Sequence, residues 1–460
     1  MKKTLLLIVF TTLIQGISVG QNNLTLYNME VLPQNLLPNP AKTPDCKWYI
    51  GMPAVSSIDF QFASNALAFK SINDAIVERS GGDGYSFQLG KFAQTLDEET
   101  FVNLGVNAEL LNFGFRLRKS MFTFGITEKV KTRISIPNDI LKLGAQGNGG
   151  NNLGYDFNFN FGFDVIHTRE FALGYSRQFL NDKLTVGARM KYIRGLNVLS
   201  TDKNDLKFRT DENNFAYNVT ADVELNASSP GLSLIDGGEV DPLAVGLGSL
   251  KNSGFGIDLG AEFDLTKRIS VSASLVDLGL ISWNEDVQNL KSENPGAIFQ
   301  YRGIDLNDYI GDSSQGFEVL LDTLADVFRL DSSNNGFNTT LFSEFYLGGN
   351  FRLTDRHQAG VLFYGSFYNK QLYPALTLSW NSKLTRFFAI SVSYSMMHGN
   401  FQNLGLGFVT NLGPEQFYIV SDHAIGAATS NVKNLGGRFG WNHVFGRKKY
   451  EKEQRVKRGK

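Results

Sequence analysis

The chain has 460 residues, of which 42% are hydrophobic and 19% are charged, and its formal net charge is −1. With no acidic or basic excess over the whole chain, charge alone indicates no class of partner. Glycine (47 residues) and phenylalanine (37 residues) are frequent, while the mean hydropathy is slightly below zero. Strands with one apolar and one polar face give this combination, so the low hydropathy does not exclude a membrane barrel.

Residues 1–20 are expected to be an export signal peptide. Two lysines precede the apolar stretch 5–14, and small residues precede an expected cleavage site before Gln21. About ten apolar residues are too few for a spanning helix, which needs about 20. We therefore expect an extracytoplasmic mature chain, in which the single cysteine, Cys46, has no internal disulfide partner.

The next region, residues 21–100, lacks a strand pattern. Five prolines fall between positions 33 and 53, and the amphipathic stretch Ala66–Val77 follows them. The spacing of its apolar residues predicts a short helix. We expect residues 21–100 to form a plug inside a lumen or a periplasmic cap.

Residues 101–446 repeat a two-faced pattern. In the stretch 155–164 every second residue from Phe157 to Phe163 is aromatic and the others are mostly polar, and 183–192 and 388–396 alternate similarly. Successive side chains of a strand point to opposite faces, so each strand has one apolar and one polar face. The export signal, the length of the strands and an aromatic closing strand favour a membrane barrel over a soluble sandwich.

We predict an all-β fold, a closed antiparallel transmembrane β-barrel of fourteen strands. They are expected near 104–118, 121–135, 159–179, 183–198, 214–226, 253–265, 267–281, 341–353, 357–368, 371–382, 385–398, 401–411, 414–423 and 434–446. Tight turns should lie in the periplasm, and the long connections 227–252, 282–340 and 424–433 outside. Segment 199–213 fits this scheme poorly, because strand parity makes it periplasmic although it is too long for a tight turn. Sixteen strands is therefore the alternative.

A short helix is expected inside the longest external loop. Apolar residues recur at helical spacing over 317–329. Such a helix packs on its own loop or forms a lid over a hydrophobic opening. The lid candidates are Phe317, Leu321, Leu324 and Phe328.

The polar faces of the strands predict the lining of the lumen. The candidate lumen-facing residues are Asp156, Asp164, Lys183, Arg189, Lys191, Ser391 and Ser393. The lumen should thus be polar with mixed charge. The charges either pair across the lumen or line a path for a solute.

The last strand is aromatic and a basic tail follows it. Residues 438–445 resemble the terminal-strand signal of outer-membrane barrels, although His443 occupies a position that usually holds an aromatic residue. The segment 447–460 has eight basic and two acidic residues. We expect it to be a basic periplasmic tail near lipid head groups or a partner.

Several short motifs together resemble a known family. They are Asn-Pro-Ala at 39–41, Leu-Gly-Tyr-Ser-Arg at 173–177 leading into 184–189, the stretch 272–279, Asn-Leu-Gly-Leu-Gly at 403–407 and Asn-Leu-Gly-Pro at 411–414. The chain resembles an uncharacterised family of outer-membrane β-barrels common in Bacteroidota, a domain of unknown function. The resemblance implies a cell-envelope barrel broadly similar to long-chain fatty-acid transporters, and it transfers no functional residues.

The sequence offers no catalytic or metal-binding pattern. The five histidines are scattered without the spacing of a helical zinc pair. Gly144–Gly150 lacks the lysine and the helix of a phosphate-binding loop, and Gly311–Gly316 does not match a nucleophile elbow. We expect no enzyme activity, no metal site and no cofactor.

Two functions remain for a barrel in the outer membrane. The first is passage or binding of a small, perhaps hydrophobic, solute, which a plug and a loop lid would suit. The alternative is a non-transporting envelope scaffold or an accessory component of a surface secretion system. The expected partners are outer-membrane lipids and, during insertion, the barrel assembly machinery. We expect a monomer that does not bind nucleic acid.

Overall fold

A computed structural model describes residues 23–79, 84–96, 98–229, 248–301, 330–368, 371–397, 400–424 and 433–447. Three predicted features lie outside these residues. They are the export signal at 1–20, the loop helix at 317–329 with its four lid candidates, and the tail from residue 448 onward.

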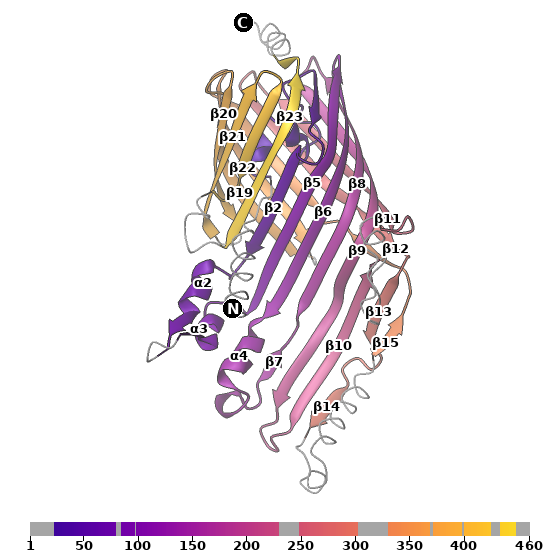
Figure 1. Ribbon diagram of the computed structural model, residues 1–460, viewed down its shortest axis with the longest axis vertical. Coiled ribbons are helices and arrows are strands. Elements are labelled where there is room, and N and C mark those ends of the chain that lie inside the picture. The colour runs from indigo at the N-terminus through magenta and orange to yellow at the C-terminus, as the bar shows by residue number, and fades with distance from the viewer. Residues whose placement is uncertain are drawn as a thin grey trace.

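The described strands close into one antiparallel barrel (Figure 1). Every position in the wall is hydrogen-bonded to a neighbour on each side, and there are fourteen such positions. Around the ring they are β1 (Trp48–Gly51) with β2 (Ser57–Ser64), β5 (Glu99–Leu117), β6 (Ser120–Pro137), β8 (Gly162–Phe179), β9 (Leu184–Thr210), β10 (Tyr217–Ser228) with β11 (Ser253–Asp264), β12 (Ile269–Trp283), β17 (Glu344–Arg352), β18 (His357–Tyr368), β19 (Gln371–Ser382), β20 (Phe388–Met397), β21 (Asn400–Leu412), β22 (Glu415–Ser421) and β23 (Asn434–Phe445). The prediction of a closed barrel with fourteen strands is confirmed.

Two of the fourteen positions differ from the predicted strand list. β1 and β2 pair with β23 on one side and β5 on the other, so the wall begins at Trp48 and not at residue 101. β10 and β11 pair with the same edge of β9, β10 with its residues 198–210 and β11 with 184–194. They are therefore two pieces of one wall position, separated by an insertion. Strand parity had placed segment 199–213 in the periplasm, although it is too long for a periplasmic turn. The conflict disappears, because this segment is the outer end of β9 and its turn into β10.

Smaller elements lie inside the wall or beyond its strands. They are the 3-10 helices η1 (Leu26–Asn28), η2 (Pro33–Leu36) and η3 (Gly150–Asn152), the helices α2 (Phe69–Ala75), α3 (Leu89–Ala93) and α4 (Asn138–Gln146), and the strands β3 (Ile76–Glu78), β4 (Tyr85–Phe87), β7 (Asp156–Asn158), β13 (Val287–Ser292), β14 (Ile298–Tyr301), β15 (Leu330–Ser333) and β16 (Phe337–Thr340). No helix among the described residues is long and apolar enough to cross a membrane.

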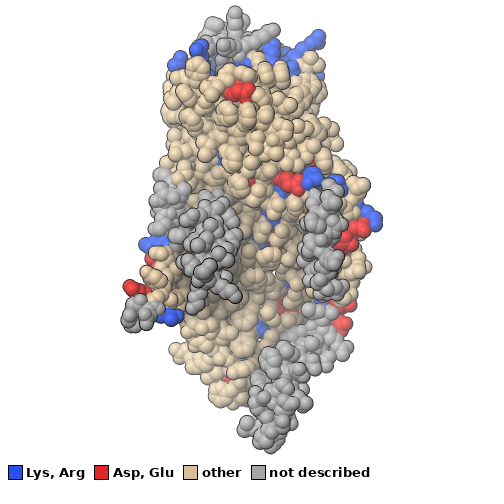
Figure 2. Space-filling view, viewed as in Figure 1, with Lys and Arg blue, Asp and Glu red and all other residues tan. Residues whose placement is uncertain are grey.

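The outer face of the wall is apolar. Leu173 on β8, Met190 on β9 and Phe255 on β11 are 66%, 69% and 71% exposed, although a water-soluble protein of this size would bury such residues. Figure 2 shows a band almost free of charged side chains below the charged rim at the C-terminal end. Such a band is what the hydrocarbon layer of a bilayer requires of a spanning barrel.

The connections assign the two ends of the barrel. Short turns join β5 to β6, β8 to β9, β11 to β12, β17 to β18, β19 to β20 and β21 to β22. They lie at the end where Trp48 faces Phe445 and Phe115. Barrels of this class place short turns in the periplasm. The opposite end, where β9 and β10 extend furthest, is therefore external (Figure 1).

Residues 23–47 form a plug inside the barrel. Its side chains hydrogen-bond to Ser393 on β20, Ser379 on β19, Ser272 on β12, Glu262 on β11, Glu109 on β5 and Asn442 on β23. A single segment can contact strands all around a ring only from within it. The carboxylate of Asp422 accepts the backbone N–H groups of Leu24 at 3.1 Å and Thr25 at 2.7 Å, which fixes the external end of the plug.

Wall glycines make room for this plug. Six of them have a Cβ position that would lie within 3 Å of a plug atom, namely Gly187 on β9, Gly260 on β11, Gly348 on β17, Gly360 on β18, and Gly405 and Gly407 on β21. Any larger residue there would push into the plug backbone or its side chains. The plug therefore has a shaped seat along this side of the wall, which we call the glycine seat.

The periplasmic end of the plug is also buried. Lys42 is 3.4 Å from Glu262, whose carboxylate outweighs the effect of burial and raises the pKa of Lys42, so the ammonium stays charged. Cys46 is fully buried, and burial raises the pKa of its thiol to about 12. Because the thiolate is the reactive species, Cys46 should resist alkylation while the plug is seated.

Alanine in the glycine seat should loosen the plug. A methyl group at Gly187 meets the Pro40 carbonyl oxygen at 2.3 Å, and one at Gly260 meets the Asn39 Oδ1 at 2.1 Å. Overpacking of this kind costs about 1–3 kcal/mol. Gly187→Ala and Gly260→Ala should therefore speed the alkylation of Cys46 in the folded, detergent-solubilised protein. Gly437→Ala is the matched control, because a Cβ there has no neighbour within 4 Å; an unchanged rate in the first two variants contradicts the seat.

Arginine on the outer face should hinder insertion according to its depth. Ile390 is an outward residue of β20, where Ile390→Arg should cost about 2–4 kcal/mol if it lies near the midplane. Leu384, 44% exposed in the turn before β20, is at the periplasmic rim, where Leu384→Arg should cost at most about 1 kcal/mol. The measurement is the fraction of refolded protein that inserts into liposomes as urea is titrated. Equal losses would contradict the assignment of the lipid face.

Candidate functional site

The structure separates the predicted lumen residues into three groups. Arg189 and Lys191 lie together in a buried cluster inside the barrel. Ser391 and Ser393 also face inward, but they are buried against the plug. The alternating pattern alone suggests that an arginine at Ser391 would disturb the barrel only mildly, whereas this packing means that it would not. The other three predicted residues lie away from this cluster.

Asp164, Asp156 and Lys183 occupy more exposed places. The Asp164 carboxylate accepts the backbone N–H of Thr201 at 3.1 Å near the outer part of β8. Asp156 is exposed on β7 beyond the apolar band, 3.6 Å from Arg209, and Lys183 is exposed in the periplasmic turn between β8 and β9. Lys183 lies just before β9 begins and Asp156 is the exposed first residue of β7, so neither belongs to the buried cluster, and the expectation that they face the lumen stays a prediction.

A β-bulge in the wall creates the centre of the cluster. The pairing of β11 with β12 shifts after Ile257, which leaves Asp258 and Asp277 out of register. Asp277 has φ +56°, a left-handed conformation that non-glycine residues rarely adopt, and its N–H donates to the Asp258 carboxylate at 2.8 Å. Bulges redirect side chains and recur beside functional sites. Here the bulge brings two carboxylates together inside the barrel.

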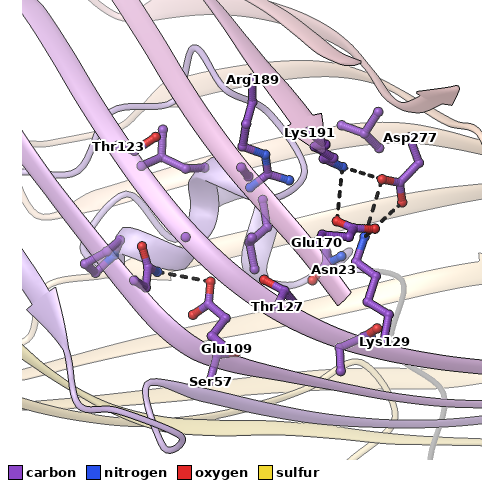
Figure 3. Close-up of a pocket in the computed structure, with 18 of the residues that line it drawn as sticks. Asn23, Ser57, Glu109, Thr123, Thr127, Lys129, Glu170, Arg189, Lys191 and Asp277 are labelled. Atoms are coloured by element: carbon purple, nitrogen blue, oxygen red, sulfur yellow. Dashed lines mark hydrogen bonds and ion pairs between the residues drawn. The ribbon is translucent and has the colours of Figure 1, made fainter. Parts of the chain in front are cut away.

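Cations from the neighbouring strands meet these carboxylates (Figure 3). Lys191 Nζ is 2.7 Å from Asp258 and contacts Asp277 directly, and Arg189 Nε is 2.7 Å from Asp258. Lys129 on β6 bridges Asp277 at 3.3 Å and Glu170 on β8 at 2.8 Å. The cluster thus balances three cations with three carboxylates. A buried network of this kind is stable only when every charge is paired.

The cluster borders a cavity of about 90 Å³ between the plug and the wall. Its lining comes from the plug, β1, β2, β5, β6, β8, β9, β12, β17 and β23, and includes Glu109, Thr127, Lys129, Lys131, Glu170 and Asp277. A polar space of this size holds several ordered waters. We call it the seam cavity, because it follows the seam between the plug and the wall.

The plug is thus held differently on its two sides. Against β9, β11, β17, β18 and β21 it lies on the glycine seat, where close contact leaves no room. Against β5, β6 and β8 long polar side chains span the distance to it and enclose the seam cavity. Lys131 on β6 also lines this cavity, and its ammonium lies 5.1 Å from the ring centre of Phe342, just before β17.

A second polar group fixes the plug beside the cavity. Arg438 on β23 donates to Ser57 at 2.6 Å, to the plug residue Asn23 at 2.9 Å and to Asp59 at 3.0 Å. Gln34 of the plug donates to Glu109 at 3.2 Å. These contacts hold the plug where it lines the seam cavity.

Sequence reasoning missed Lys129, Glu170, Asp258 and Asp277. Lys129 and Glu170 sit at lumen-facing positions of predicted strands, so the same alternation that found Arg189 could have found them. Asp258 likewise follows the alternation of β11, between the exposed Ile257 and Leu259, whereas Asp277 carries no such signal. The bulge interrupts the alternation of β12 at Asp277, and only the three-dimensional pairing shows it.

Removing the central cation should destabilise the barrel. Lys191→Met leaves Asp258 and Asp277 buried and short of one cation, which costs about 3–5 kcal/mol. Lys203→Met is the matched control, because Lys203 forms an exposed pair with Asp222 at 3.4 Å, worth at most about 1 kcal/mol. Guanidinium unfolding in detergent measures both free energies. A loss near that of Lys203→Met would show that the cluster does not hold the wall together.

Comparisons with solved structures return other barrels. The toluene transporter TbuX of Ralstonia pickettii is 9% identical, with 90% of this chain and 94% of that chain covered and a TM-score of 0.43. The toluene transporter TodX of P. putida is 11% identical, with 89% and 93% covered and a TM-score of 0.41. The translocator domain of the autotransporter NalP from Neisseria meningitidis is 8% identical, with 86% and 88% covered and a TM-score of 0.30. No curated protein matches the sequence.

The family comparison covers most of the chain. The model described as "Family of unknown function (DUF5723)" matches residues 40–422, which include the lower part of the plug and the wall as far as β22. The closed wall and its apolar outer band place the protein in the outer membrane. The chain is an outer-membrane β-barrel that belongs to the family of unknown function DUF5723.

Proposed function

We propose that this barrel binds a small solute and passes it across the outer membrane through the seam cavity. The observation that carries the proposal is the asymmetric packing of the plug. One side of the plug is fixed in the glycine seat. On the other side a polar, partly filled space lies between the plug and parts of β5, β6 and β8, beside direct contacts such as Gln34 with Glu109 and the packing of Leu36 with Met121. A solute that follows the seam leaves the seat intact.

The lining supports a path through side chains that can move. Lys129 and Lys131 lie on the lumen face of β6 and line the cavity. Thr127 lines it too, one inward position closer to the periplasmic end of the strand. Lys131 can change rotamer at low cost, whereas Lys129 is held by its ion pairs with Asp277 and Glu170, and the plug backbone on the glycine seat has no free space. A solute larger than a few waters would displace these side chains first.

The character of the solute is only partly supported. The polar lining favours a solute with hydrogen-bonding groups. The expectation of a hydrophobic solute depends on the lid helix at 317–329, which lies outside the described residues, and it stays a prediction. We also infer a monomer without enzyme activity, inserted by the barrel assembly machinery.

A non-transporting scaffold is the second candidate. The observation that favours it is the extent of structure beyond the apolar band. β9 runs for 27 residues, well beyond the length that a membrane requires. β10 pairs with its outer end, and β13 and β14 pair in turn with β10. A surface of this size suits the binding of another envelope protein.

Uptake into liposomes that contain the purified barrel separates these functions. Thr25→Cys with Ser393→Cys places two thiols where the hydroxyl oxygens are 2.7 Å apart, so their oxidation should fasten the plug to β20. Thr127→Trp should fill the seam cavity that Thr127 lines. We expect uptake of small sugars and amino acids to survive the cross-link and to fall at least several-fold in Thr127→Trp.

Each outcome of the uptake measurement has a definite meaning. Loss of uptake on oxidation that is restored by reductant means that the plug itself must leave, and it contradicts the seam path. No uptake above that of empty liposomes, by a barrel shown to be inserted, favours the scaffold. Thr201→Trp is the size control, because this residue bonds Asp164 and Phe163 near the outer end of the wall and does not line the seam cavity.

A further inference from the structure

A small helical unit stands beside the barrel at its external end. It comprises α2, β3, β4 and α3, between wall strands β2 and β5. Figure 1 shows α2 and α3 to the side of the barrel and not over its mouth. We call these residues, 69–79 and 84–93, the lateral unit.

The height of the lateral unit follows from the strand that precedes it. β2 pairs with the outer part of β23, which has 12 residues. At about 3.3 Å per residue and a tilt of about 45°, such a strand rises roughly 25 Å, which is the height of the apolar band. β2 ends at Ser64 and α2 begins at Phe69, so α2 lies just beyond the outer edge of this band.

The lateral unit presents an apolar face to its surroundings. Ile72 and Ile76 are one helical turn apart and are 40% and 43% exposed. Ile76 is the cross-strand partner of Phe87, which is 48% exposed. Tyr85, 72% exposed, lies on the same face of this ribbon opposite the exposed Glu78, so the face holds one carboxylate among its apolar residues. The other side of the unit packs on α4, where a Cβ at Gly144 would lie 2.9 Å from Leu89 and where Asn138 donates to the carbonyl oxygen of the buried Ala93 at 3.0 Å.

We propose that this face rests on the outer leaflet of the membrane. Its occupant is lipid because the face continues the lipid-facing band of the barrel, in which Phe60 and Phe62 are the outward residues of β2. Aromatic residues such as Tyr85 and Phe87 favour the boundary between acyl chains and head groups. The exposed Lys70 and Arg79 of the same unit suit the anionic groups of lipid heads. The lateral unit thus anchors the external end of β2 and β5 at a fixed depth.

A fluorescent reporter on the unit tests this contact. Ile76→Cys can be labelled with an environment-sensitive dye without removing Cys46, because Cys46 is buried and its thiolate is suppressed. In phosphatidylcholine nanodiscs we expect a blue-shifted dye that is quenched several-fold more by a nitroxide on the lipid chain than by aqueous iodide. Asp74→Cys, on the opposite side of α2, is the matched control and should show the reverse preference.

A smaller reporter excludes an effect of the dye itself. Tyr85→Trp, through an indole that a membrane interface accepts readily, should add quenching by the same nitroxide lipid beyond that of the four native tryptophans, measured as the difference from the unsubstituted barrel. The proposal is overturned if the reporters at positions 76 and 85 are as accessible to iodide as the one at position 74. Resistance of the barrel to sodium dodecyl sulfate before heating verifies that each variant is folded.

Discussion

The width of the lumen is the constraint on which the rest of the structure depends. A closed wall of fourteen strands surrounds more space than its own inward side chains can fill. This protein fills the space with its own N-terminal segment, and the wall omits side chains where that segment lies. Gly260 and Gly405 show the result, since each faces the plug at a distance that even a methyl group would not allow. Wall and plug are therefore one packed unit, with most of the plug buried from water.

The charges inside the barrel depend on the same packing. The six charged groups of the cluster, Asp277 among them, are buried or nearly so. Their burial is tolerable because each pairs with a partner from another strand. They also join β6, β8, β9, β11 and β12 across the lumen face, at the place where the bulge weakens the backbone pairing of β11 with β12. Electrostatic pairing thus compensates locally for lost hydrogen bonds. The same side chains border the seam cavity, so stability and the proposed path share residues.

The sequence predicted the wall well because alternation is a local property. In the middle of β20, for instance, the apolar Ile390, Val392 and Tyr394 alternate with three inward serines. Two features depended on distant pairing and could not be predicted. β1 and β2 are short and interrupted, and only their partners in β23 and β5 make them strands of the wall. β10 and β11 each have the length of a full strand, and only their shared edge on β9 shows that they form one position.

The candidate site was predictable only in part, for a related reason. Arg189 and Lys191 follow the alternation of β9, whereas the bulge that aims Asp277 at them leaves no mark in the sequence. The role of the glycines was equally hidden. A glycine count indicates many close approaches, but which glycines face the plug depends on the position of residues 23–47 in space.

The place of the plug in the chain has a consequence for assembly. Residues 23–47 come immediately before β1, and β1 and β2 are the elements against which β23 closes the ring. The ring is therefore closed by the pairing of the first wall strands, β1 and β2, with the last, β23. The segment that must be enclosed is attached directly to β1. Once β23 has paired, the long ring offers little space for threading a segment through. We therefore expect the plug to be enclosed before β23 pairs with β1 and β2 during insertion.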